Sequence, residues 1–325
     1  MKPIIRGVLI IGLGKIGMEY DINISNSKIV YSHSRAFSIH PNFEVLGAVD
    51  SSVLKCKTFS EKYLKPSYNS VSEALSILNP DVVVISAPTK YHKSILCEIL
   101  EFSSPEAILC EKPLSYSVDE AGEMLKLCDI KGIKLFVNYI RQSDPGSIII
   151  RDLINSGKIG KKFKGTAWYS KGFIHNGSHF FNLLEYWLGP CKDYSIISKG
   201  RLWQDHDPEP DVYVEFEKGT VVFMSAWEES FSHYALELIS DYCRIRYEKG
   251  GELILLEKTK TDPNFPDYTV LNGLPEIIAS DMDRYQLNVV EQLFQALSNK
   301  NSSICSGFDA YETIKQITKI TNKIK

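Results

Sequence analysis

Few features of exported, metal-bound or membrane proteins occur in this sequence. Its seven cysteines form no C-x-x-C pair and are odd in number, which argues against a disulfide framework or a bound metal and favours reduced thiols in a cytoplasmic protein. The longest early apolar run, residues 8–11, is too short for the core of a signal peptide. No segment approaches the roughly 20 apolar residues of a membrane-spanning helix. We therefore expect neither export nor membrane association.

An excess of positive charge is also absent. The chain has 37 Lys and Arg against 40 Asp and Glu, for a net charge of −3. Without a broad basic field, we expect no nucleic-acid partner. A local basic pocket does not show in a net charge, so an acidic small-molecule substrate remains open.

The 325 residues, of which 44% are hydrophobic, can bury a large core and predict two domains. In the first part of the chain, short apolar runs alternate with helical patterns. This alternation predicts a doubly wound parallel sheet, a Rossmann fold, over residues 1–139. The predicted strands are residues 7–11, 43–49, 81–86, 107–110 and 134–138.

After about residue 140 the pattern changes to strands of alternating polarity, which predicts an α+β domain with a mostly antiparallel open sheet over residues 140–325. A segment rich in Pro, Asp and Asn, residues 258–275, is typical of a surface loop or lid. The predicted strands are 163–169, 195–201, 211–217, 220–227, 234–240, 243–247 and 252–256, the last pairing with its predecessor. The predicted helices are 147–155, 179–188, 284–298 and 309–322.

A glycine motif follows the first predicted strand directly: Gly12-Leu13-Gly14-Lys15-Ile16-Gly17. A buried strand before it and an acid at the end of the next strand, Asp50, are the context that a dinucleotide-binding motif requires. Gly12 allows a tight turn, Gly14 lets the backbone approach a pyrophosphate, and Gly17 lets the next helix pack closely. The gap from Gly17 to Asp50 is longer than the usual ~20 residues, which we attribute to an insertion around residues 22–32.

Asp50 also bears on the choice of cofactor. A carboxylate there can accept hydrogen bonds from ribose hydroxyls and would repel a 2′-phosphate. No Arg follows it, although Lys55 could still reach a phosphate. The sequence therefore favours NAD over NADP.

Three further segments complete a pattern, and with the glycine motif they resemble the Gfo/Idh/MocA oxidoreductase family. The segments are Ala87-Pro88-Thr89-Lys90-Tyr91-His92 after the third strand, Glu111-Lys112-Pro113 after the fourth, and Gly177-Ser178-His179 at the start of a helix in the second part. The four motifs occur in the family's order and span nearly the whole chain.

The resemblance implies hydride transfer between a nicotinamide and a hydroxyl or keto carbon of a sugar, sugar nucleotide or cyclitol, by a homodimer or homotetramer. It implies that Lys112 reaches the reacting oxygen near the nicotinamide and that His179 is the acid/base. Residues 1–139 would bind NAD(P) and residues 140–325 would bind substrate and form the oligomer. The implied cofactor-binding residues are Gly12, Gly14, Lys15, Ile16, Gly17, Asp50, Ala87, Pro88, Thr89, His92, Glu111 and Lys112.

One position departs from the family pattern. His175 stands where an Asp commonly precedes the catalytic histidine by four residues. Either His175 shares the catalytic work or binds substrate, or catalysis is altered or lost, as in a protein that senses NAD(P) or a ligand without turnover. We expect His179, at a helix N-terminus, to stay neutral and serve as the base, because the helix dipole disfavours its protonated form.

The expected substrate-binding residues include two whose side chains could equally be surface charges, Arg141 and Lys171. The full set is Lys112, Arg141, Lys171, His175, Asn176 and His179. The sequence leaves the substrate, the direction of the reaction and the oligomeric state undetermined.

Overall fold

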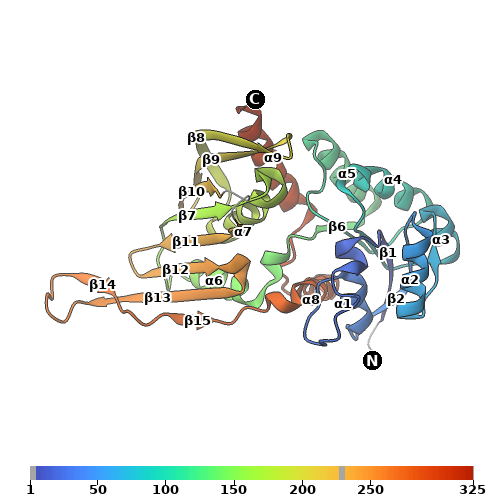
Figure 1. Ribbon diagram of the computed structural model, residues 1–325, viewed down its shortest axis with the longest axis horizontal. Helices are drawn as coiled ribbons and strands as arrows, with labels where there is room; N and C mark the ends of the chain where they lie inside the picture. The colour runs from blue at the N-terminus through green and yellow to red at the C-terminus, as the bar shows by residue number, and fades with distance from the viewer. Residues whose placement is uncertain (1–4, 227–230, 325) are drawn as a thin grey trace. The chain divides into compact units, whose positions relative to one another are not determined.

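The computed structural model describes residues 5–226 and 231–324 of the chain (Figure 1). It divides into two compact units, and the division is not a single cut. Unit 1 comprises Met1–Ser143 and Asp283–Ile314, and unit 2 comprises Asp144–Met282 and Lys315–Lys325. The structure therefore differs from the expected division at 139/140, because a later stretch of the chain returns to the first unit. Within the described residues, no helix is both long enough and apolar enough to cross a membrane.

Unit 1 contains the predicted Rossmann sheet. Six strands lie in the order β3-β2-β1-β4-β5-β6, and every neighbouring pair is parallel. Strands β1 and β4 are buried at every residue. This agrees with their continuous apolar runs, which are typical of a parallel sheet covered on both faces. The strands are β1 (Arg6–Ile11), β2 (Phe43–Val49), β3 (Ser67–Tyr68), β4 (Val82–Ile85), β5 (Ala107–Cys110) and β6 (Lys134–Val137). The two-residue strand β3 is the one that the sequence pattern missed.

Four helices of unit 1 begin at side-chain caps that the sequence supplies. Ser32, Ser52, Ser70 and Ser117 each accept a backbone N–H bond from the first turn of the helix that follows. These helices are α1 (His33–Ile39), α2 (Val53–Tyr63), α3 (Val71–Ile77) and α5 (Val118–Lys131), whereas α4 (His92–Phe102) begins without a side-chain cap. Short turns are η1 (Lys15–Glu19), η2 (Thr89–Tyr91), η3 (Ile140–Ser143) and η6 (Met282–Arg284).

The predicted insertion after the glycine motif is an ordered loop between η1 and α1. Its base is closed by Asp21, a buried residue whose carboxylate accepts bonds from the backbone of Tyr31 and from both the backbone and the hydroxyl of Ser32. The Arg35 guanidinium donates to the carbonyl oxygens of Asp21, Ile24 and Asn26. The loop is therefore held by its own polar groups.

Helix α8 (Tyr285–Leu297) explains why residues 283–314 belong to unit 1. Its buried side chains Val289, Val290, Leu293 and Leu297 lie in the same apolar cluster as residues of β1, β2 and β4. An amphipathic helix is stable where its apolar face is covered by other parts of the protein. The periodicity of the sequence indicates that α8 has such a face, but it does not indicate which sheet covers it. The sequence alone therefore could not predict this return.

Unit 2 is built on a nine-stranded sheet in which β10 and β7 are parallel and the other neighbouring pairs are antiparallel. Its order is β14-β13-β12-β11-β7-β10-β9-β8, with β15 beside β13. The strands are β7 (Phe163–Tyr169), β8 (Cys191–Trp203), β9 (Asp207–Phe216), β10 (Gly219–Ser225), β11 (Ala235–Ile239), β12 (Cys243–Glu248), β13 (Leu253–Thr261), β14 (Thr269–Leu271) and β15 (Glu276–Ile278). The predicted strand 220–227 ends at 225, and residue 227 lies outside the described residues.

The helices of unit 2 pack on the sheet through one large apolar core. That core joins side chains of α6 (Pro145–Asn155), α7 (Ser178–Leu188) and the second half of α9 (Gly307–Asn322) to inward-facing residues of the strands. The remaining turns are η4 (Gly172–Gly177) and η5 (Lys249–Gly251).

The prediction that residues 258–275 form a loop or lid holds for residues 262–268 and 272–275, which are turn or irregular, but it is wrong for the strand residues 258–261 and 269–271. Strand β13 continues to Thr261 and pairs with β14, so the segment is a long β-hairpin that extends past the neighbouring strands (Figure 1). Its Pro, Asp and Asn residues lie chiefly in the turn, where they suit the backbone. Threonine and valine lie on both sides of that turn, and these β-branched residues favour the paired strands.

Candidate functional site

The glycine turn of unit 1 has the geometry of a dinucleotide-binding loop. Gly12 has a φ of 100°, and a Cβ on it would lie 2.6 Å from the backbone nitrogen of Ala87. A Cβ on Gly17 would lie 2.0 Å from the carbonyl oxygen of Gly12. Only glycine fits at either position, because both clashes are with backbone. The space that Gly14 leaves is different, since a Cβ there would meet only the Nζ of Lys55, at 3.9 Å.

Asp50 lies at the end of β2 and braces this turn. Its two carboxylate oxygens accept bonds from the backbone N–H of Leu13, at 2.7 Å, and of Ser52, at 2.9 Å. A carboxylate has about four acceptor positions, so these bonds leave capacity for ribose hydroxyls. Lys15 is exposed and Ile16 half-buried, both in the π-helical turn η1.

The open space over Gly14 fits a pyrophosphate group. A backbone without a side chain faces it, the Nζ of Lys55 lies at its edge, and the carboxylate of Asp50 stands at the neighbouring strand end. Lys55 also pairs with Glu19 at 3.3 Å, so its charge is partly balanced. These residues could hold a dinucleotide, with Asp50 at the adenosine ribose.

The Ala87–Pro88–Thr89 turn leaves the end of β4, beside the glycine turn. His92, which begins α4, is fully buried and lies 2.9 Å through Nε2 from the carbonyl oxygen of Ala87 and 3.2 Å through Nδ1 from that of Leu114. Burial lowers the pKa of His92 despite these carbonyl contacts, so the ring is neutral and donates to one carbonyl at a time. His92 thus ties the turn after β4 to the turn after β5.

Glu111 and Lys112 open the turn after β5, and Lys112–Pro113 is a cis peptide. Burial raises the pKa of the Glu111 carboxyl, but hydrogen bonds from His33 and Asn138 and the charge of Lys112 outweigh it and hold that pKa below its usual value. Lys112 is half-buried and lies two residues after the end of β5. Arg141 lies in η3 after β6, also half-buried.

In unit 2, residues 170–177 follow β7 and lead into α7; we call this segment the histidine loop. Lys171 adopts a left-handed conformation with a φ of 65°, and Gly172 follows with a φ of 78°. Two buried carboxylates on β9 bind the amides that come next. Glu209 accepts from Gly172 at 3.1 Å, and Asp207 accepts from Ile174 at 3.0 Å and from His175 at 2.8 Å.

This arrangement corrects the expectation that His179 lies at a helix N-terminus. The π-helical turn η4 runs directly into α7, so the helical chain begins at Gly172, seven residues earlier. The carboxylates of Asp207 and Glu209 occupy that positive end. Burial raises the pKa of Asp207, while the two amide bonds oppose that effect. The helix dipole therefore gives no reason for a neutral His179.

The side chains of the loop meet aromatic neighbours. The His175 ring stacks on the Trp203 indole, with centroids 5.2 Å apart and planes at 19°. Asn176 donates to the hydroxyl of Tyr234 at 2.8 Å. His179 is half-buried in the first turn of α7.

Sequence reasoning missed Asp207, Glu209, Trp203 and Tyr234. The acidic residues of the segment Asp207-Pro208-Glu209-Pro210 were a usable signal, because charged residues at inward positions of a strand need partners. Trp203 and Tyr234 gave no signal, since only the folded sheet brings them beside the loop.

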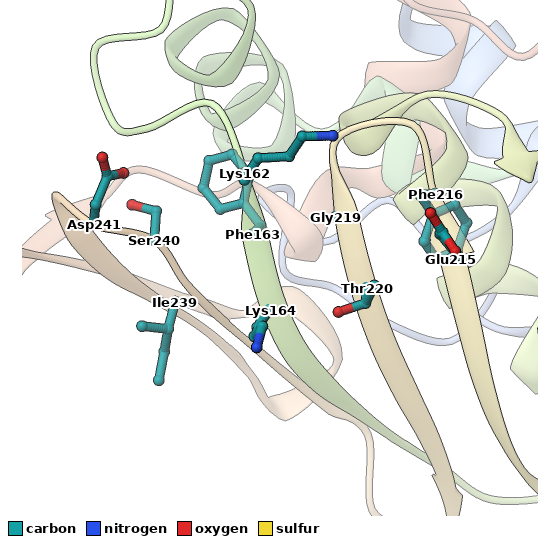
Figure 2. Close-up of a pocket in the computed structure, with 10 residues that line it drawn as sticks. All are labelled: Lys162, Phe163, Lys164, Glu215, Phe216, Gly219, Thr220, Ile239, Ser240 and Asp241. Atoms are coloured by element: carbon teal, nitrogen blue, oxygen red, sulfur yellow. The ribbon is translucent and has the colours of Figure 1, made fainter.

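A hollow of about 410 Å³ lies elsewhere in unit 2, where β7 begins (Figure 2). Figure 2 shows Lys162 and Phe163 at its rim, with Thr220 and Ile239 on the flanking strands. The histidine loop follows the opposite end of β7, about 20 Å away at ~3.3 Å per strand residue. This hollow is therefore not the candidate site.

The candidate residues thus form two groups, each within one unit. Unit 1 gathers the three turns at the carboxyl edge of its sheet, where open α/β sheets bind their ligands. Unit 2 gathers Lys171, His175, Asn176 and His179 on a single loop and the helix after it. Over the described part of the chain, no three His, Cys, Asp or Glu side chains are grouped to hold a metal ion.

Comparisons with known proteins agree with the geometry of unit 1. The sequence profile of an oxidoreductase family with an NAD-binding Rossmann fold matches residues 6–139. An uncharacterized oxidoreductase of Bacillus subtilis, YrbE, is 28% identical over 163 residues, which are 49% of this chain and 42% of that protein. An inositol 2-dehydrogenase of Rubrobacter xylanophilus is 31% identical over 98 residues, 30% of this chain and 28% of that one. The matches span less than half the length of these curated relatives.

Solved structures extend the likeness to the whole fold. The WlbA dehydrogenase from Bordetella pertussis, in complex with NADH and UDP-GlcNAcA, superposes with a TM-score of 0.75 over 99% of this chain and 97% of that one. At 12% sequence identity, this likeness concerns the fold.

Proposed function

Because the chain belongs to the Gfo/Idh/MocA oxidoreductase family, we propose that it is an NAD-dependent dehydrogenase or ketoreductase. Its substrate would be a hydroxyl or keto carbon of a sugar, sugar nucleotide or cyclitol. The observation that carries the proposal is the open backbone at Gly14 beside the Asp50 carboxylate, within the stretch that matches an NAD-binding fold. The inositol 2-dehydrogenase and the UDP-GlcNAcA-bound dehydrogenase among similar proteins support the substrate class.

The roles of the residues follow from their chemistry and from the family resemblance. NAD, when bound, supplies the hydride acceptor. The Lys112 ammonium would donate a hydrogen bond to the substrate oxygen and stabilise negative charge that develops there. His179 would take the hydroxyl proton in the oxidation direction, and His175 with Asn176 would orient the substrate.

The cofactor preference rests on Asp50. Its carboxylate would accept bonds from both ribose hydroxyls of NAD and repel the 2′-phosphate of NADP. The Nζ of Lys55 lies beside Gly14 and also pairs with Glu19. From this position the ammonium would bind the pyrophosphate and not a 2′-phosphate. We therefore propose NAD as the cofactor.

Assembly is a further part of the proposal. Trp168, Tyr213 and Ile239 lie exposed on strands whose alternate residues form the core, so they mark the face of the unit 2 sheet turned away from the helices. We expect this face to join copies of the chain in a homodimer or homotetramer, and light scattering would measure the mass.

A single experiment tests the enzyme against a protein that binds without turnover. Purified protein is titrated with NADH, followed by fluorescence, and NAD reduction is then followed with a panel of inositols, sugars and sugar nucleotides. Binding together with reduction of NAD supports the dehydrogenase. Tight binding without turnover on any member of the panel supports a sensing role, and absence of NADH binding rejects both.

A further inference from the structure

Three buried side chains and the largely buried carboxylate of Glu111 form a closed ring of hydrogen bonds in unit 1. His33 Nε2 lies 2.8 Å from Glu111 Oε1, and Gln286 Nε2 lies 2.7 Å from His33 Nδ1. Asn138 Nδ2 lies 2.5 Å from Glu111 Oε1 and 3.2 Å from Gln286 Oε1. His33 and Gln286 are completely buried. The ring thus joins α1, the end of β5, the end of β6 and α8.

Only one arrangement of protons satisfies this ring. Glu111 is ionised, so the Asn138 group facing it must be the NH₂, because an amide oxygen there would repel the carboxylate. The same NH₂ faces Gln286, which must therefore present its oxygen to Asn138 and its NH₂ to His33. His33 Nδ1 must then accept, and His33 Nε2–H must donate to Glu111. The ring specifies a neutral His33 with its proton on Nε2.

The ring fixes the residue that precedes Lys112. The Glu111 backbone N–H donates to the Ile85 carbonyl at 2.8 Å, while its carboxylate is held by His33 and Asn138. Backbone and side chain are both restrained one residue before Lys112. The Lys112 charge also contributes to lowering the pKa of Glu111, and this attraction acts on both partners.

The insertion after the glycine turn brings His33 to this place. Val30 N–H donates to the Asp283 carbonyl at 2.8 Å, and Gln286 N–H donates to the Val30 carbonyl at 3.3 Å. The Tyr285 hydroxyl donates to the Tyr31 carbonyl at 3.0 Å. The end of the insertion, at Val30 and Tyr31, is therefore paired with the start of α8, and these two residues lie three and two positions before His33.

We propose that His33 and Gln286 are positioning residues for Lys112, acting through Glu111. Gln286 sets the tautomer of His33, His33 orients the carboxylate of Glu111, and the carboxylate sets the place and the electrostatic environment of the Lys112 ammonium. Buried partners that fix a tautomer are a known way to orient a functional group. The inference rests on the proposed function only for the importance of Lys112, so its test reads the ring and Lys112 without a substrate.

The test compares Gln286→Glu with Gln295→Glu, which adds the same charge to α8 at a residue paired with Glu291 outside the ring. Histidine labelled with ¹⁵N reports the tautomer, and the His33 signals are assigned by their loss in His33→Gln. Reductive methylation with ¹³C-formaldehyde reports Lys112, whose signal is assigned by its loss in Lys112→Arg. Circular dichroism checks folding, and Gln286→Met replaces Gln286→Glu if the latter unfolds.

We expect His33 to carry its proton on Nε2 in the unaltered protein. In Gln286→Glu, an acceptor faces Nδ1, so His33 should gain a second proton and the Lys112 signal should move. Gln286→Met removes the donor to His33 Nδ1 while Glu111 still faces Nε2, so the Nδ1 signal of His33 should shift and the Lys112 signal should also move. Gln295→Glu should leave both signals in place.

A His33 that carries its proton on Nδ1 in the unaltered protein would overturn the proposal. So would a Lys112 signal that stays fixed while His33 changes, because the ring would then be structural only. Neither result depends on turnover, so the proposed dehydrogenase activity could fail while this inference stands, or the reverse.

Discussion

Replacing Gly14 with alanine is expected to separate cofactor binding from folding. The backbone at Gly14 has φ −72° and ψ −161°, which alanine adopts without strain, and the new Cβ would meet only Lys55 Nζ, at 3.9 Å. Alanine at such a position restricts the unfolded chain and stabilises by about 0.4–1 kcal/mol, while loss of glycine before a helical turn costs a similar amount. The free energy of unfolding should therefore change by less than about 1 kcal/mol.

The same methyl group would occupy the space through which a pyrophosphate approaches the backbone. One hydrogen bond to a charged group contributes about 1.5–3 kcal/mol, and each 1.4 kcal/mol is a factor of ten in affinity. Losing one such bond should weaken NADH binding by roughly 10- to 100-fold. Isothermal calorimetry would measure the affinity, and thermal unfolding the stability.

Gly17→Ala is the contrasting variant. Its Cβ would lie 2.0 Å from the Gly12 carbonyl oxygen, and neither backbone segment can move aside without disturbing β1 or the Ala87 turn. Overpacking of this kind costs typically 1–3 kcal/mol and sometimes more, so we expect at least about 3 kcal/mol of lost stability. Unchanged NADH affinity in Gly14→Ala, or a loss of stability as large as that of Gly17→Ala, would refute the assignment of the open space to the pyrophosphate.

Four other substitutions test the remaining site residues. Asp50→Ala should weaken NADH binding and narrow its advantage over NADPH, and calorimetry showing tighter NADPH binding to the unaltered protein would contradict the basis of this prediction. Lys112→Ala should lower kcat/KM by on the order of 100-fold with the fold intact, because it removes one electrostatic stabiliser; near-normal turnover would remove Lys112 from the mechanism. His179→Ala should lower kcat by roughly 10²–10⁴-fold, whereas His175→Ala should act mainly on KM, since its ring stacks on Trp203; exchanged effects would reverse the two roles.

Local pattern was enough to predict the Rossmann sheet and its glycine turn. The buried β-branched runs, the serine caps and the spacing of Gly12, Gly14 and Gly17 are all properties of short stretches of chain. Asp50 was predictable as well, because the carboxyl end of β2 lies beside the turn that follows β1 in any such sheet. The strands β7 to β13 of unit 2 were predictable for the same reason, since a half-buried strand shows alternating polarity, but the short strands β14 and β15 were not predicted.

Tertiary structure decided what surrounds these residues. The periodicity of α8 indicated an apolar face but not the sheet that covers it, and the return of residues 283–314 to unit 1 brings Gln286 to His33. The sequence motif predicted that the helix begins at His179. In the structure the helical chain begins at Gly172, where the carboxylates of Asp207 and Glu209 accept its first amide bonds. Each of these contacts joins residues more than 30 positions apart, and no local pattern specifies which distant polar group will satisfy a buried amide or imidazole.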